Sequence, residues 1–260
     1  MAKSIESMLE ILDFYLFNTG DIASDRRSGT TVTLRNNCGY TVWAGMYART
    51  KSNPRYVPPS GGGWHMSPGQ VVNIPVPNDL VAGRWWGRTG CRTTNGHFHC
   101  DTGDCGPWLD CGNHHSTGEP PASLAEITLN SPQDFYDLSL VDGFNIPLTL
   151  KPTSRYGGGN AYWCKEAYCR TDMNAICPSE LQKVVNGRVV GCKSACVAFH
   201  RDEYCCAGAH NRPQTCNPAT WPKDYHAVFK NPCPTAYSYA YDDHTSTFTC
   251  QNTNYDVIFC

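Results

Sequence analysis

The sequence predicts a mainly β protein that is cross-linked by disulfides and suited to an oxidising compartment. The chain has 16 cysteines in 260 residues, an even number that extends from Cys38 to Cys260. Such a framework persists only where the environment is oxidising. The chain also has 23 glycines and 18 prolines, which are typical of many turns. Short segments alternate in β-branched and aromatic residues, whereas long helical periodicity is scarce.

The charge and hydropathy of the chain argue against two classes of protein. The 21 Lys and Arg residues against 23 Asp and Glu give a net charge of -2, so no basic surface for nucleic acid is indicated. No apolar segment approaches the roughly 18 residues that a membrane-spanning helix needs. The length of 260 residues suits one large β domain or two smaller ones.

Residues 1–29 differ from the rest of the chain. They contain neither the basic start nor the uninterrupted apolar core of a secretory signal, so we expect an atypical N-terminal extension. The cysteines still predict export, because accidental pairing of so many thiols is the weaker explanation. The apolar residues recur at the spacing of a short amphipathic helix: Ile5, Met8, Leu9, Leu12 and Leu16.

Short strands are predicted from residue 30 onward. Residues 31–34 and 40–43 are rich in β-branched and aromatic side chains, and they flank a turn at 36–39. Proline and glycine predict a loop over 51–67. The further strand candidates, in chain order, are 71–76, 83–89, 122–129, 135–141, 246–250 and 255–260.

Two cysteine-rich stretches interrupt the predicted strands. Residues 90–121 carry four cysteines, four of the nine histidines and little apolar periodicity, which predicts a small loop region closed by disulfides. In the second stretch, residues 178–189 and 194–200 are predicted to form short helices within a lobe rich in cysteine. The predicted β core is therefore interrupted twice and is completed by the C-terminal strands.

Metal binding is the alternative interpretation of both stretches. Zinc sites usually combine two short Cys or His pairs at set distances, and 16 thiols would need four such sites. Loop histidines are more often simply solvated. We therefore predict no metal and no cofactor, and disulfides whose pairing the spacing leaves open. The residues weighed as metal ligands are Cys192, Cys196, Cys205, Cys206, His97, His99, His114 and His115.

A series of motifs from about residue 31 to residue 260 resembles the thaumatin-like proteins. The family signature lies at 96–111, beginning GHFHCDTGDC, and Pro107-Trp108 departs from it where the family usually has a second glycine. The other motifs are NCGYTVWA at 37–44, RWWGRTGC at 84–91, PPASLAE at 120–126, DFYDLSLVDGFN at 134–145, EYCC at 203–206 and AYSY at 236–239.

This resemblance implies a flattened antiparallel β-sandwich of about eleven strands with a cleft between the sandwich and a disulfide-rich lobe. The implied parts are a core at 30–88, 120–170 and 234–260, a small loop domain at 89–119 and the lobe at 171–233. The implied disulfides are Cys38–Cys260, Cys91–Cys100, Cys105–Cys111, Cys164–Cys250, Cys169–Cys233, Cys177–Cys192, Cys196–Cys205 and Cys206–Cys216.

The resemblance also implies that acidic residues line the cleft. One regular strand would point Asp137 and Asp142 to opposite faces, so the turn signal at Asp142-Gly143 must redirect Asp142. The alternative to Asp242 is its neighbour Asp243. The implied lining is Arg84, Glu126, Asp137, Asp142 and Asp242, with Phe144, Tyr239 and Trp86 as aromatic surfaces for sugar rings.

Such acids suit two kinds of chemistry. Glycoside hydrolysis needs a protonated and an ionised carboxyl, which would be Glu126 as acid and Asp142 as nucleophile or base, with Arg84 holding the ionised partner. Binding alone needs only carboxylates that accept hydrogen bonds from sugar hydroxyls. The residue types fit both.

The resemblance therefore implies a monomeric defence protein, secreted to the apoplast or held in the vacuole, that acts against fungi. Its expected partner is β-1,3-glucan or another cell-wall polysaccharide, and a fungal membrane or surface protein is a further candidate. Two rival functions remain. One is a weak endo-β-1,3-glucanase that uses Glu126 and Asp142, and the other is an inhibitor or partner-protein binder whose cleft is idle.

Overall fold

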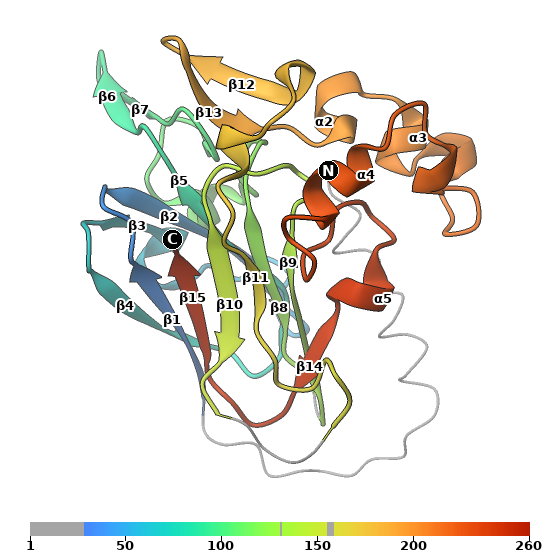
Figure 1. Ribbon diagram of the computed structural model, residues 1–260. Helices are drawn as coiled ribbons and strands as arrows, with labels where there is room; N and C mark the ends of the chain where they lie inside the picture. The colour runs from blue at the N-terminus through green and yellow to red at the C-terminus, as the bar shows by residue number, and fades with distance from the viewer. Residues whose placement is uncertain (1–28, 131, 155–158) are drawn as a thin grey trace.

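Two packed β-sheets form the body of the protein in the computed structural model, which describes residues 29–130, 132–154 and 159–260 (Figure 1). Helices gather beside one end of the sheets, where α2, α3 and α4 lie together. The amphipathic helix predicted near the N-terminus falls outside the described residues. The division into core, loop domain and lobe stays a prediction.

The first sheet has five strands in the order β11-β10-β15-β1-β4. The C-terminal strand β15 therefore lies inside the sheet, where it pairs antiparallel with β10 and parallel with β1. This parallel pair is an exception to the antiparallel arrangement that the resemblance implies. The strands are β1 (Thr30–Asn36), β4 (Val71–Val76), β10 (Leu148–Pro152), β11 (Ala167–Cys169) and β15 (Tyr255–Phe259).

The second sheet has six strands in the order β14-β9-β8-β5-β2-β3. Together the two sheets contain the expected eleven strands. Residues 51–67 were predicted to be a loop, but the last part of this stretch forms strand β3. Its four residues follow the part that is rich in proline and glycine, and they pair with β2. The strands are β2 (Val42–Thr50), β3 (Gly63–Met66), β5 (Leu80–Arg88), β8 (Leu124–Thr128), β9 (Asp134–Ser139) and β14 (Phe248–Cys250).

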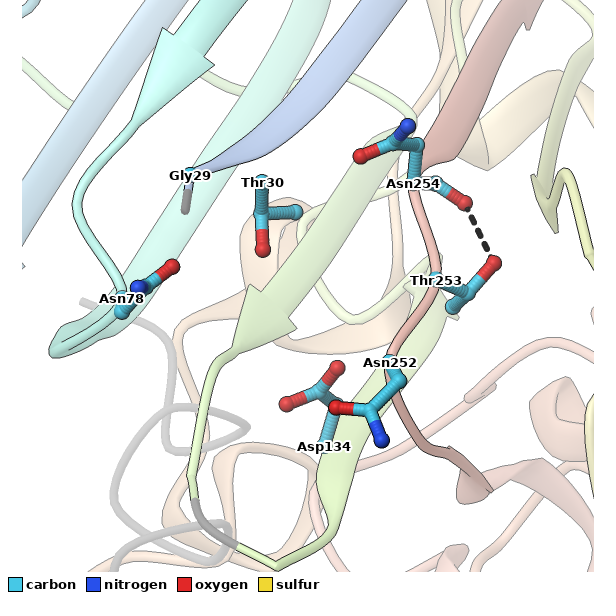
Figure 2. Close-up of a pocket in the computed structure, with 7 residues that line it drawn as sticks. All are labelled: Gly29, Thr30, Asn78, Asp134, Asn252, Thr253 and Asn254. Carbon is cyan, nitrogen blue, oxygen red and sulfur yellow. Dashed lines mark hydrogen bonds between the residues drawn. The ribbon is translucent and has the colours of Figure 1, made fainter. Parts of the chain in front are cut away.

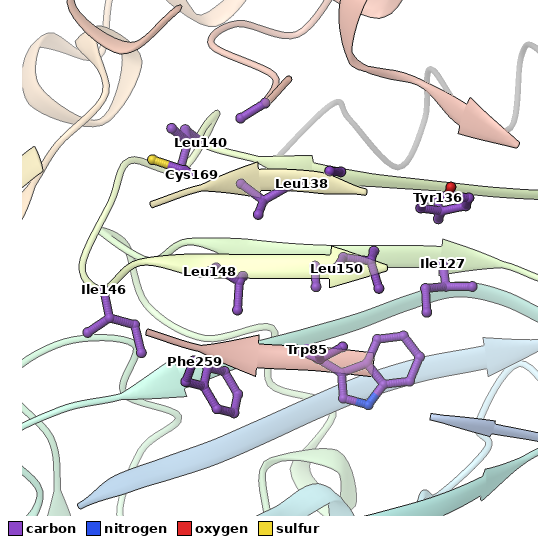
Figure 3. Packing of buried hydrophobic residues seen from close by; sticks show 14 of the residues in the cluster. Trp85, Ile127, Tyr136, Leu138, Leu140, Ile146, Leu148, Leu150, Cys169 and Phe259 are labelled. Atoms are coloured by element: carbon purple, nitrogen blue, oxygen red, sulfur yellow. The ribbon is translucent and has the colours of Figure 1, made fainter. Parts of the chain in front are cut away.

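Apolar side chains from both sheets form the core between them (Figure 3). Trp85 and Leu138 come from the six-stranded sheet, and Leu148 and Phe259 from the five-stranded sheet, and each is at most 1% exposed. Burial of one such side chain contributes about 1.5–3 kcal/mol. Because side chains alternate along a strand, the neighbours of Trp85 on β5 point to the opposite face of the sheet.

The loop region covers part of that opposite face. It contains the hairpin of β6 (Arg92–Thr94) and β7 (His97–His99), and the short helix η2 (Cys111–His114) packs near η1 (Pro59–Gly62). Buried Arg88 holds this region to β5, since its guanidinium donates to the carbonyl oxygens of Trp108 at 3.1 Å and Leu109 at 2.7 Å. Burial lowers the pKa of Arg88 to about 10, opposed by nearby carboxylates.

The lobe contains short helices and one hairpin. Helix α2 confirms the helix predicted at 194–200, and Ser194 caps it by accepting from the amide of Val197. The helix predicted at 178–189 is confirmed only for the short 3-10 helix at Ser179–Leu181, because from Gln182 the chain forms a hairpin whose tight turn, Asn186-Gly187, has both residues at positive φ. The elements are η3 (Met173–Ala175), η4 (Ser179–Leu181), β12 (Gln182–Val185), β13 (Arg188–Cys192), α2 (Ala195–Phe199), α3 (Asp202–Cys205), η5 (Gly208–His210), η6 (Pro218–Thr220), α4 (Tyr225–Lys230) and, beyond it, α5 (Asp243–Ser246).

All eight disulfides have the pairing that the resemblance implies, so this prediction is confirmed. The bond between Cys38 and Cys260 joins residues 222 positions apart in the sequence. Four of the bonds lie in or at the lobe, where the helices are too short to be stable alone. Within the described ranges, no helix has the length and apolarity required to traverse a bilayer.

Candidate functional site

A row of charged side chains crosses three neighbouring strands of the six-stranded sheet. Arg84 on β5 lies opposite Glu126 on β8, and Glu126 lies opposite Asp137 on β9. Directly opposed residues share a face, and here it is the face away from the apolar core. The guanidinium of Arg84 contacts Glu126 Oε1 through Nε and Nη2, each at 3.1 Å.

The buried position of this row limits what it can contact. Arg84 is 3% exposed, Glu126 is 1% exposed and Asp137 is fully buried. The Arg84–Glu126 contact is therefore a desolvated ion pair, which is strongly destabilised if only one partner is removed. The expected acid Glu126 is engaged in this pair beneath the protein surface.

Asp137 is the most unusual member of the row. Neither of its carboxyl oxygens has a hydrogen-bond partner among the described residues. Burial is the main cause that raises the pKa of Asp137 well above its usual value, and the negative charges of Glu126 and Asp243 raise it further, opposed by Arg84. Asp137 therefore favours the protonated, neutral form.

Asp142 reaches the same arginine from a turn rather than from a strand. Strand β9 ends at Ser139, and the chain reverses through residues 141–142 into Gly143, whose amide donates to the carbonyl of Leu140. One oxygen of Asp142 lies 3.5 Å from Arg84 Nη1. The turn thus brings Asp142 to the row, as the sequence predicted.

Gly143 is required at this turn for two reasons. Its φ is 91°, in the region that side chains with a Cβ rarely adopt. A Cβ there would also lie 2.4 Å from the carbonyl oxygen of Cys192, which belongs to strand β13 of the lobe hairpin. The turn that positions Asp142 therefore requires glycine at residue 143.

Asp142 is the member of the row that lines a cleft. The cleft has a volume of about 770 Å³ and lies between the turn that carries Asp142 and helices α2 and α3 of the lobe. The side chain of Asp142 is 14% exposed. Burial raises the pKa of Asp142, while Arg84 opposes the increase.

The two walls of the cleft carry different groups. The sandwich wall presents Glu119, Pro120, Val141 and Asp142. Glu119 was not predicted as a lining residue. The lobe wall presents His200 and Asp202 among apolar and cysteine residues, and these two polar residues were not predicted either. Their signal in the sequence is weak: they lie between Cys196 and Cys205, whose bond folds α2 against α3. The further lining residues are Val197, Tyr204, Ala207 and Ala240.

Asp242 is placed apart from the row and is not among the residues that line this cleft. Its Oδ2 accepts from the amide of Ser238 at 3.1 Å and contacts Lys230 Nζ at 2.8 Å. Its neighbour Asp243 accepts from Tyr237 and acts electrostatically on Asp137. Of the two candidates, Asp243 is therefore the one coupled to the row, and Asp242 anchors the chain before α5.

The expected aromatic surfaces are only partly available. Phe144 and Trp86 are fully buried, so the prediction that their rings face sugar is wrong. Trp86 instead packs on the Cys105–Cys111 bond and donates to the carbonyl of Gly103 at 2.8 Å. Tyr239 is half-buried and lines a narrow pocket that shares Val141, Cys196 and Tyr204 with the cleft.

A second depression lies at the far end of the sandwich, near the start of β1 (Figure 2). Asparagine, threonine and Asp134 line it, and Thr253 donates to the carbonyl of Asn254 at 2.9 Å. Its volume of about 20 Å³ suits roughly one water molecule and not a sugar ring. None of the predicted site residues lines it.

Comparison with known proteins gives consistent matches. The model of the Thaumatin family matches residues 36–260. The chain is 48% identical over 236 residues to the pathogenesis-related thaumatin-like protein 3.5 of Cryptomeria japonica, covering 90% of this chain and 91% of that protein. It is 46% identical over 257 residues to the pathogenesis-related protein 5 of Arabidopsis thaliana, covering 98% of each.

Among solved structures, a laminaripentaose-producing β-1,3-glucanase in complex with laminaritetraose has a similar fold. The TM-score is 0.61 at 13% sequence identity, and the match covers 89% of this chain and 98% of that chain. At this identity the likeness concerns the fold alone.

Proposed function

The chain belongs to the thaumatin family, and from this membership we propose that it is a secreted defence protein that binds β-1,3-glucan in the cleft beside Asp142. The defence role is supported by relatives at 46–48% identity that are pathogenesis-related proteins. Secretion is supported by the eight disulfides, which need an oxidising compartment. The glucan is the ligand that the family resemblance implies.

The observation that carries the proposal is the position of Asp142 in a cleft of about 770 Å³. This volume is within the range of small-molecule sites in proteins, so several sugar units fit. Asp142, Glu119 and Asp202 offer carboxyl oxygens to sugar hydroxyls, and Pro120 and Val141 offer apolar surface to the faces of pyranose rings. Such a mixture of few polar groups on an apolar wall is typical of saccharide recognition.

Binding without turnover is favoured over hydrolysis by the burial of Glu126. A general acid must come within hydrogen-bond distance of the glycosidic oxygen. Glu126 is 1% exposed and its Oε1 is occupied by Arg84. Asp137 holds a proton more readily, but it is fully buried. The weak glucanase therefore remains the second candidate, and it requires Glu126 to become accessible.

Two measurements on the oxidised full-length protein test the proposal. Calorimetry should detect binding of a soluble β-1,3-linked glucohexaose, and Asp142→Asn should weaken it about tenfold, because an ionised hydrogen-bond acceptor is lost. Reducing-end release should be absent from the parent. Release that disappears in Glu126→Gln would establish the hydrolase instead.

The partner-protein alternative predicts a different pattern. If the parent protein fails to bind the glucohexaose yet inhibits a fungal hydrolase, and Asp142→Asn leaves this inhibition intact, the cleft is idle. That result would refute glucan binding.

A further inference from the structure

His200 lies on the lobe wall of the cleft, and no contact with a described residue explains the presence of its polar side chain there. It is exposed, and it makes no hydrogen bond or ion pair with any described residue. The sandwich wall opposite it carries Asp142 and Glu119. Both ring nitrogens of His200 are therefore available to a molecule in the cleft.

The backbone holds His200 firmly in place. It follows α2 and adopts a left-handed conformation, with φ of 53° and ψ of 33°. Its amide donates to the carbonyl of Cys196 at 2.9 Å. Cys196 is bonded to Cys205 of α3, so the residues on both sides of His200 are cross-linked. A ligand would meet an imidazole whose Cα–Cβ direction is already set.

The conformation also makes histidine a costly choice for this position. Helices commonly end in glycine at a left-handed residue, because a Cβ is disfavoured there. Histidine therefore lowers stability relative to glycine without a compensating contact to the described protein. A residue that is strained and exposed and that lines a cleft is a reason to infer a ligand contact.

The chemistry of the two walls is complementary. On the sandwich wall the carboxylates of Glu119 and Asp142 only accept hydrogen bonds, whereas the imidazole of His200 on the lobe wall offers a donor, and in its neutral form also an acceptor. A sugar hydroxyl both donates and accepts. The hydroxyl groups of a glucan chain can thus donate hydrogen bonds to Asp142 on one wall. The oxygens of other hydroxyl groups can accept a hydrogen bond from the imidazole of His200 on the other wall.

We propose that His200 is a specificity-determining contact that binds hydroxyl oxygens of the glucan across the cleft from Asp142. The proposal rests on the proposed function, and it identifies His200 as the residue of the lobe that contacts the glucan. It also gives a reason for a histidine at a position where the backbone conformation favours glycine.

His115 supplies a matched control elsewhere in the chain. It is also an exposed histidine in a left-handed conformation, with φ of 51° and ψ of 30°, at the end of η2. It does not line the cleft. Glycine at either position relieves the same backbone strain, so both substitutions should leave the melting temperature unchanged or raise it.

The experiment compares His200→Gly, His115→Gly and Asp142→Asn as oxidised full-length proteins with the same β-1,3-linked glucohexaose. We expect His200→Gly to weaken binding about tenfold while remaining folded, and His115→Gly to bind as the parent does. Binding by His200→Gly within twofold of the parent, with Asp142→Asn impaired, would overturn the proposal and leave the proposed function intact. A parent protein that does not bind would overturn both.

Discussion

Asp137 shows how the environment of a single residue decides its charge. Its pKa is raised mainly by burial, so the folded state holds the proton more tightly than the unfolded state does. This preference stabilises the fold below the usual pKa of an aspartate. The contribution is lost as the pH rises through the raised pKa of the folded state.

Asparagine is close in shape to neutral aspartic acid but cannot ionise. We therefore expect Asp137→Asn to be more stable than the parent at pH 8 and to lose less stability between pH 5 and pH 8. Urea denaturation with the disulfides intact measures this difference across the pH series.

Asp79 provides a control of opposite sign. Its pKa is lowered, chiefly because Ser52 donates a hydrogen bond to the carboxylate. Asp79→Asn should therefore cost a little stability at pH 8. If Asp137→Asn behaves in the same way as Asp79→Asn, the buried carboxyl is ionised and our assignment of its charge is incorrect.

At the scale of elements, the turn after β9 affects both the stability of the fold and ligand binding in the cleft, because it contains Gly143 and Asp142. In Gly143→Ala the new Cβ would meet the Cys192 carbonyl in a backbone conformation that disfavours it. We expect a loss of about 2–4 kcal/mol and weaker glucan binding, because Asp142 precedes the displaced residue.

The control is Gly187→Ala in the lobe hairpin. Gly187 has a φ of 76°, but a Cβ there has no neighbour within 4 Å. Its substitution should cost only about 1 kcal/mol and leave binding unchanged. Equal losses of stability in the two variants, measured by denaturant titration, would show that the close approach at Gly143 is relaxed without cost.

Local sequence patterns predict some of the elements that form the site, but not how distant elements pack together. Strands β5, β8 and β9 follow from alternation, and their register then brings Arg84, Glu126 and Asp137 together. The Asn-Gly pair at 186–187 is typical of a two-residue hairpin turn, and the helix prediction does not take it into account. His200 lines the cleft because distant segments pack against each other, and no local pattern near His200 indicates this.

The burial of the site residues was equally beyond local patterns. The sequence marks Phe144 and Trp86 as aromatic, but not which face of the sheet the lobe and loop region cover. It also marks Asp242 and Asp243 as equivalent. Only the fold distinguishes them, since Lys230 pairs with one and Tyr237 donates to the other.

For the whole molecule, the disulfides differ in how much of the chain they constrain. The Cys38–Cys260 bond spans 222 residues, whereas Cys91–Cys100 spans only 9. In the chain-entropy model a longer closed loop stabilises more. We expect Cys38→Ser/Cys260→Ser to lose about 4–5 kcal/mol and Cys91→Ser/Cys100→Ser about 2–3 kcal/mol, measured by guanidinium titration. Equal losses would count against the entropic account for this protein.

The position of β15 has a consequence for biosynthesis. This strand fills the place between β10 and β1, and its residues 255–259 are synthesised after those of every other strand that the structure describes. While the ribosome is still translating, β1 can pair with β4 on one side only, and its other edge stays open. The sheet is therefore completed only after residues 255–259 have been synthesised, and until then the edge of β1 that β15 will cover is open to pairing with other strands.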